Sequence, residues 1–214
     1  MNVSTIMLCV SCNLNIQEGI YNENFTEIFL KTLLPLVVLI PLILLYNHSK
    51  VRNSLGDTEK PKLLKAPVIA YSLLIGIGMG GFVDGIVLHQ LLQWHQMLSN
   101  QLAPVTLEAK SINMFWDGVF EAVTWILTLA GIILMWLSRK RTDLDLSNKI
   151  FIGGLIAGWG IFNVMDSANH FIFRYHNVRD NVPNPEAWNI GFLIMAILMV
   201  LIGWGIMRMN TRRT

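Results

Sequence analysis

Residues 66–98 read APVIAYSLLIGIGMGGFVDGIVLHQLLQWHQML, and this stretch decides the fold. Its first part is an apolar run that approaches the roughly 20 residues an α-helix needs to cross a bilayer. Asp84, His89 and His95 follow towards its end. Ionisable groups at the margin of a membrane span are energetically costly, so they are candidates for a functional role. We expect one membrane helix here, from about Ala66 to about Leu98.

The composition of the whole chain also indicates a membrane protein. Of the 214 residues, 53% are hydrophobic and 14% are charged, whereas a soluble domain carries roughly 25% charged residues. The formal net charge of +2 is too small to suggest a nucleic-acid partner. Cys9 and Cys12 are the only cysteines, which excludes a multi-cysteine zinc or iron–sulfur site. For this pair we expect a disulfide or no function, with a copper-receiving thiol pair as the alternative.

Four further apolar stretches predict an all-α, polytopic bundle of five transmembrane helices. The chain divides into an N-terminal segment (1–27), the transmembrane domain (28–208) and a basic tail (209–214). The expected spans are about 28–46, 66–98, 112–137, 150–173 and 190–207. Four glycines give the second span a smooth face for close helix packing: Gly76, Gly78, Gly80 and Gly81.

Lysine and arginine residues lie mainly on one side of the predicted bundle. The loop after the first span holds five of them, the loop after the third span holds three, and three more follow the fifth span at Arg208, Arg212 and Arg213. The opposite side has Lys31, Lys110, Arg174 and Arg179. Because basic residues accumulate on the cytoplasmic side of membrane proteins, we expect the N-terminus outside and the C-terminus in the cytoplasm.

With this topology, three helices place carboxylates and imidazoles in one layer at the outer membrane interface. The residues are Asp84, His89 and His95 on the second span, Asp117 and Glu121 on one face of the third, and Asp166 and His170 on the fourth, with His176 beyond it at the surface. No comparable set of acids and imidazoles occurs in the inner halves of the spans. The layer is therefore the candidate functional site.

Helical spacing indicates which of these side chains share a face. Asp166 and His170 are four residues apart, so they lie on one face of their helix. Asp84 and His95 are eleven apart and return to roughly the same face of an ideal helix, whereas His89 points elsewhere. We therefore expect that the two histidines of the second span need not serve one site.

Imidazole and carboxylate donors without thiolate suit copper(II), iron or zinc. We expect the metal ligands to be Asp84, His89, His95, Asp166, His170 and His176, with Asp117 and Glu121 as additional ligands. These last two carboxylates can instead fix the tautomer of a ligating imidazole. The alternatives are solvated histidines at positions 95 and 176, aspartates that only cap or join helices, and proton or substrate handling.

The segment GFVDGIVLHQLLQWH (residues 81–95) resembles the signature of a domain-of-unknown-function family of predicted multi-spanning bacterial membrane proteins. The stretches DGVF (117–120), GWGIFN (158–163) and HNVR (176–179) are similar to the same family. The resemblance covers roughly residues 66–207. It implies the bacterial inner membrane, with the outer face in the periplasm. Because members tend to occur near membrane factors for haem–copper oxidase assembly, it also implies a link to copper or respiration.

The chain departs from the pattern of this family at several histidines. The family tends to have paired histidines where this chain keeps only the first of each pair: His95-Gln96, His170-Phe171 and His176-Asn177. Glu121 stands where the family tends to have a histidine, and the interval from Asp166 to His170 is one residue short. The missing histidines argue against a site that needs all of them, whereas the survival of the first histidine of each pair favours a smaller site over none.

The leading hypothesis is metal handling, or assembly and support of a respiratory or oxidative membrane enzyme, with copper favoured over iron or zinc. Its partners would be membrane lipid and a respiratory oxidase or another membrane complex. One alternative is a membrane-embedded metal-dependent hydrolase or oxidase whose apolar substrate enters from the bilayer. A second is a haem b protein with one axial histidine from the second span and one from the fourth. The third is a metal-free accessory subunit.

Overall fold

The computed structural model of the chain describes residues 13–21, 24–55 and 63–209. This part of the chain is helical and contains no β-strand. The elements are α1 (Leu14–Ile20), α2 (Asn24–Ile28), η1 (Phe29–Leu33), α3 (Leu34–Leu55), α4 (Ala66–Phe82), η2 (Val83–Leu91), α5 (Leu107–Ser138), α6 (Asn148–Phe171) and α7 (Pro185–Arg208), in which η marks a π-helix. Cys9 and Cys12 lie outside the described residues.

Five helices of the described chain are long and apolar enough to span a membrane, which confirms the predicted all-α bundle. They cover Thr26–Arg52, Ala66–Leu91, Leu107–Ser138, Asn148–Phe171 and Pro185–Arg208. A helix of 24 residues, the length of the last two, is about 36 Å long and exceeds the roughly 30 Å of a bilayer core. The second span ends at Leu91, earlier than the limit near Leu98 that its apolar run predicts.

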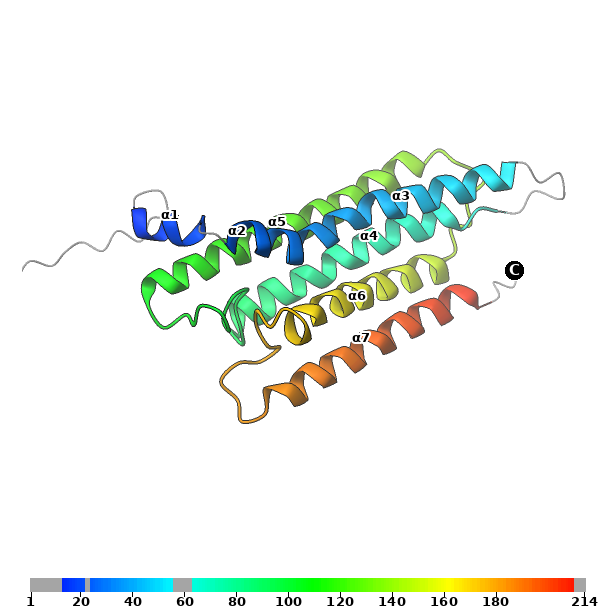
Figure 1. The fold of residues 1–214 in the computed structure, drawn as a ribbon. Helices are drawn as coiled ribbons and strands as arrows, with labels where there is room; N and C mark the ends of the chain where they lie inside the picture. Colours follow the sequence, from blue (N-terminus) through cyan, green and yellow to red (C-terminus); the bar gives the residue numbers. More distant parts are fainter. Residues whose placement is uncertain (1–12, 22–23, 56–62, 210–214) are drawn as a thin grey trace, which may run out of the picture.

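α4 lies in the middle of the bundle, packed against both α5 and α6 (Figure 1). α7 packs on α6, and α3 packs on α4 and α5. Neighbouring spans along the chain run in opposite directions (Figure 1). The connection 92–106, between η2 and α5, therefore lies at the same end of the bundle as the connection 172–184, between α6 and α7.

Glycine residues allow the backbones of α4 and α6 to approach closely, as the smooth face of the second span predicts. A Cβ atom on Gly158 of α6 would lie 3.1 Å from the Cα of Gly76 and 3.0 Å from the backbone nitrogen of Ile77. On the other side of α4, a Cβ on Gly81 would lie 2.8 Å from the Cβ of Thr124 on α5. Close contact on two sides fixes the helix that leads into η2.

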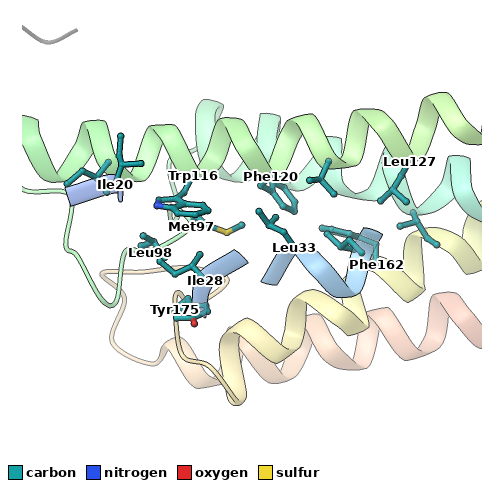
Figure 2. Close-up of a cluster of buried hydrophobic side chains, with 14 of the residues drawn as sticks. Ile20, Ile28, Leu33, Met97, Leu98, Trp116, Phe120, Leu127, Phe162 and Tyr175 are labelled. Atoms are coloured by element: carbon teal, nitrogen blue, oxygen red, sulfur yellow. The ribbon is translucent and has the colours of Figure 1, made fainter. Parts of the chain in front are cut away.

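A hydrophobic cluster extends from the end of the bundle that carries the two connections to Leu127 and Phe162 within the spans (Figure 2). Trp116 and Phe120 of α5 contribute to it, together with Leu33 of η1. Met97 and Leu98 belong to the connection after η2, and they are only 2% and 5% exposed. Their burial beside α5 fixes the position of this connection (Figure 2).

Candidate metal centre

Asp84, His89 and His95 meet at the end of the second span. One ligand atom from each lies within 4.8 Å of the others, and all three side chains are buried. Asp84 and His89 belong to η2, whereas His95 follows in the connection to α5. A helical segment therefore positions Asp84 and His89, whereas the following connection positions His95.

The π-helical segment η2 brings Asp84 and His89 together. In a π-helix each N–H bonds to the carbonyl five residues back, so residues five apart lie about one turn apart. Asp84 and His89 have this spacing, and His89 Nε2 lies 3.1 Å from Asp84 Oδ2. The expectation that His89 points away from Asp84 is wrong, because it assumed the geometry of an α-helix. π-Helical turns are frequently found at functional sites.

A turn of the chain, and not helical spacing, returns His95 to Asp84. Regular helix ends at Leu91, and Gln93 adopts a left-handed conformation with φ of 50°. His95 Nε2 then lies 3.9 Å from Asp84 Oδ1. The sequence correctly paired the two residues, but the continuous helix on which that prediction depended does not exist.

Backbone hydrogen bonds to α5 hold this turn in place. The N–H of Met97 donates to Oδ1 of Asp117 at 2.8 Å, and the N–H of Leu98 donates to Oδ1 of Asn113 at 2.9 Å. Asn113 and Asp117 are four residues apart and therefore share one face of α5. Two polar side chains of the third span thus position the connection that carries His95.

Asp117 also orients His89. Its Oδ1 lies 2.9 Å from His89 Nδ1, in addition to accepting the backbone N–H of Met97. A carboxylate oxygen only accepts, so Nδ1 of His89 carries the proton. In the neutral ring the lone pair of His89 is then on Nε2, the atom that lies 3.1 Å from Asp84 Oδ2. A carboxylate on the far nitrogen of a ligating histidine fixes the ring and raises its basicity.

A backbone carbonyl fixes the tautomer of His95 in the same way. His95 Nδ1 lies 2.9 Å from the carbonyl oxygen of Val178, which can only accept. The N–H of Val178 in turn donates to Asn189 of α7 at 2.9 Å. Burial lowers the pKa of His95 well below its ordinary value, and the neighbouring His176 and His89 lower it further. The ring is neutral, as a metal ligand must be.

Asp166, His170 and His176 form a second group of the same kind. Asp166 and His170 are one turn apart near the end of α6, and His170 Nε2 lies 3.4 Å from Asp166 Oδ2. His176 returns from the connection after α6, where Arg174 has a left-handed φ of 54°. Its Nε2 lies 3.8 Å from Asp166 Oδ1. Burial, followed by His170 and His89, lowers the pKa of His176.

The two groups adjoin through their histidines. The rings of His95 and His176 are stacked, with centroids 4.5 Å apart and an interplanar angle of 6°. The centroids of His89 and His95 are 4.4 Å apart, and those of His170 and His176 are 4.9 Å apart. His95 and His176 are 3% and 1% exposed, so the alternative that they are solvated surface residues is wrong. The polar layer predicted from sequence is a buried cluster.

Most ligand atoms in this cluster have no hydrogen-bond partner among the described residues. The unpaired atoms include Asp84 Oδ1, His89 Nε2, His95 Nε2, Asp166 Oδ2, His170 Nε2 and His176 Nε2. Each buried polar group left unpaired costs about 1–3 kcal/mol, and native proteins pair roughly 90% or more of them. Lone pairs that face a carboxylate repel it, whereas a cation between them attracts both. The donor set therefore fits a bound metal ion.

The structure places the two carboxylates of α5 differently. Asp117 contacts His89 and is not a member of either group of ligand atoms. Glu121 is partly exposed and accepts a hydrogen bond from Gln90 Nε2. It also lies outside both groups. Of the two, Asp117 has the geometry of a supporting partner of a ligand, and Glu121 does not.

Sequence reasoning missed two contributors to the site. Asn169 donates from Nδ2 to Asp166 Oδ1 at 3.0 Å, and its three-residue spacing from Asp166 on a helix could have indicated this. The carbonyl of Val178 orients His95, but a backbone group leaves no signal in the sequence.

An apolar pocket of about 560 Å³ lies beside the first group, with Asp84 in its wall. It is bounded by η2, α6 and α7, from which Trp159 and Phe192 contribute aromatic rings. Trp188 and Met195 of α7 also line it and are 40% and 43% exposed. The pocket therefore opens outward past α7, and its volume is within the roughly 300–1,000 Å³ of ligand pockets.

Comparison with known families identifies the chain as a membrane protein of a described family. The model described as "Predicted membrane protein (DUF2243)" matches residues 71–210. This range includes both groups of donors, and the match confirms the resemblance to a domain-of-unknown-function family of membrane proteins. Neither the curated proteins nor the solved structures gave a match. Because the family model matches well over half of the chain, the chain belongs to the DUF2243 family of predicted membrane proteins.

Proposed function

We propose that this protein binds transition-metal ions at the two adjoining groups of histidine and aspartate. The observation that carries the proposal is the set of buried imidazole nitrogens and carboxylate oxygens that face one another without hydrogen-bond partners. The hydrogen bonds at Nδ1 of His89 and His95 support it, since in each neutral ring they leave the lone pair on Nε2, the nitrogen that faces Asp84. Asp117 acts as the partner that orients His89.

We assign one ion to each group, because each supplies the same three donors. Asp84, His89 and His95 provide two imidazoles and one carboxylate, and so do Asp166, His170 and His176. Two imidazoles and a carboxylate leave coordination positions for water or substrate. The stacking of His95 on His176 would hold the two ions near one another.

Copper is the favoured ion, with iron and zinc as the alternatives. Imidazole and carboxylate donors suit all three, and copper(II) has the highest affinity for such donors among the divalent first-row metals. Haem b has weaker support. The rings of His95 and His176 stack directly, with centroids 4.5 Å apart, which leaves no gap between these two rings for a porphyrin.

The role that we propose is metal handling, or assembly and support of a respiratory or oxidative membrane enzyme. The excess of lysine and arginine at the opposite end of the bundle supports a location of the metal centre at the periplasmic face of the bacterial inner membrane. Residues 1–27 would then be periplasmic, residues 28–208 would form the transmembrane domain, and the tail 209–214 would be cytoplasmic. The partner would be a respiratory oxidase or another membrane complex.

A second candidate function is favoured by the apolar pocket beside Asp84. A metal ion there would lie next to a cavity open towards the bilayer, where it could activate water or oxygen towards an apolar substrate. Turnover of such a substrate would favour an enzyme. Bound metal without turnover would favour metal handling.

The deciding experiment is elemental analysis of the detergent-purified protein together with its visible spectrum. We expect two equivalents of metal per chain, and the loss of both in a His89→Ala/His170→Ala variant. His48→Ala is the matched control, because His48 is an exposed histidine of α3 outside both groups. This variant should keep the full metal content.

Three outcomes would contradict the proposal. If the purified protein contains no metal and binds none after reconstitution with copper, iron and zinc, the site is a metal-free polar cluster. A Soret band in the visible spectrum would instead identify haem. An unchanged metal content in the double variant would mean that the ions bind elsewhere.

A further inference from the structure

We propose that the pocket beside Asp84 is a binding site for an anionic phospholipid, with one acyl chain in the pocket and the phosphate at Arg179. This inference goes beyond metal binding and does not depend on it. Three features of the described chain carry it: the apolar wall of the pocket, its opening on α7, and an arginine held at its edge by two tryptophans.

The wall of the pocket matches a hydrocarbon chain. It consists almost entirely of apolar and aromatic side chains, among them Val83, Leu88, Trp159, Phe192 and Met195. The cavity of about 560 Å³ is of the size of pockets that bury most of a small ligand. An acyl chain would therefore fill the pocket that η2, α6 and α7 enclose.

The opening of the pocket indicates that its occupant comes from the bilayer. Gly191 and Met195 line the pocket and are exposed on α7. Both lie within the membrane span Pro185–Arg208. A lipid can enter here sideways without leaving the membrane, whereas a soluble ligand would have to cross an apolar surface.

The polar end of the lipid is specified by Arg179. Its guanidinium lies 4.9 Å from the ring centroid of Trp94 and 5.0 Å from that of Trp188, and both tryptophans line the pocket. The two indole rings contact each other edge to face, with centroids 5.3 Å apart. No carboxylate among the described residues forms an ion pair with Arg179. A guanidinium held in this way is suited to bind two phosphate oxygens at once.

The headgroup, and not the chain, must provide the selectivity. Lipid tails are as apolar as the pocket, so an acyl chain gains little free energy when it moves from the bilayer into the protein. A charge-assisted hydrogen bond to phosphate contributes more. In a zwitterionic lipid the phosphate charge is balanced by the ammonium of its own headgroup. An anionic lipid therefore has the stronger attraction to Arg179.

Native mass spectrometry of the detergent-purified protein tests this proposal. Phosphatidylglycerol and phosphatidylcholine with identical acyl chains are titrated separately, and we expect one tightly bound phosphatidylglycerol per chain. Arg179→Gln should weaken phosphatidylglycerol binding roughly tenfold, as expected for the loss of charge-assisted hydrogen bonds. Arg174→Gln is the control, since Arg174 is an exposed arginine of the same connection that does not line this pocket.

A second pair of variants tests the pocket itself. A Cβ at Gly191 would meet nothing within 4 Å, so Gly191→Phe should fold and place a ring in the space for the acyl chain. It should reduce binding of both lipids. A Cβ at Gly205, on the same helix but outside the pocket, also meets nothing within 4 Å. Gly205→Phe should bind lipid like the unmodified chain.

Equal binding of the two lipids, or equal effects of Arg179→Gln and Arg174→Gln, would overturn the proposal. Displacement of phosphatidylglycerol by inorganic phosphate alone would also overturn it, because the site would then recognise a free anion. Metal content is measured on the same samples. Lipid selectivity that persists in the His89→Ala/His170→Ala variant would separate this site from the metal proposal.

Discussion

Replacing Asp117 by asparagine should weaken metal binding at the first group without disrupting the fold. Oδ1 of Asp117 accepts hydrogen bonds from His89 Nδ1 at 2.9 Å and from the backbone N–H of Met97 at 2.8 Å. An asparagine oxygen can still accept from the backbone. It carries no negative charge, so it holds the imidazole less firmly and lowers its basicity as a ligand.

The magnitude follows from the burial of this pair. The side chains of His89 and Asp117 are 1% and 7% exposed, so solvent does not screen their interaction. Loss of such a supporting partner lowers metal affinity about 10–100-fold, which corresponds to about 1.4–2.7 kcal/mol. We expect this loss for the ion of the first group only, since Asp117 contacts none of Asp166, His170 and His176.

Titration of the purified protein with a competing metal chelator measures this affinity. Glu121→Gln is the matched control, because Glu121 lies four residues further along α5 and outside both groups. It should leave the affinity unchanged. Asp117→Ala should in addition lower the unfolding temperature, because it leaves the N–H of Met97 unpaired at a cost of about 1–3 kcal/mol. Unchanged affinity in Asp117→Asn, or an equal loss in Glu121→Gln, would refute the reasoning.

Three further variants test other parts of the structure. His170→Ala should reduce the metal content from two ions to one by elemental analysis, because the group around His89 keeps all of its donors. Gly158→Leu should lower the unfolding temperature in detergent, because its side chain would overlap the α4 backbone. The expected loss in free energy of unfolding is about 1–3 kcal/mol or more. Gly118→Ala is the control and should leave the unfolding temperature unchanged, since a Cβ there meets nothing within 4 Å. Asn189→Ala leaves a buried backbone N–H unpaired and should accelerate loss of metal to a chelator; an unchanged exchange rate would argue against its role.

The membrane fold could be predicted from sequence because the bilayer imposes a minimum length on each apolar stretch. Five stretches meet this length, and the structure has helices at all of them. The polar layer could be predicted for a related reason, since ionisable groups such as Asp84 and Asp166 are costly in spans and stand out in an apolar sequence. The contact of Asp166 with His170 also followed from local geometry, because α6 is a regular α-helix at this point.

The position of His89 and the route of His95 could not be predicted in this way. Both depend on where the α-helical hydrogen-bond pattern stops, and interactions with a distant helix stabilise that point. The carboxylate of Asp117 accepts a bond from each side of the turn, from His89 and from Met97. The spacing of residues along one helix contains no information about such contacts, so only the three-dimensional structure reveals them.

The π-helix also explains how two unequal sequence spacings produce two similar groups. Asp84 and His89 are five residues apart, and Asp166 and His170 are four apart. Five residues make about one turn of a π-helix and four make about one turn of an α-helix, so each aspartate faces its first histidine across one turn. In both groups the second histidine follows six residues later, on a connection that turns back through a left-handed residue. The same donors therefore appear in the same order from two halves of the bundle, which favours two equivalent ions over one ion with an accessory ligand set.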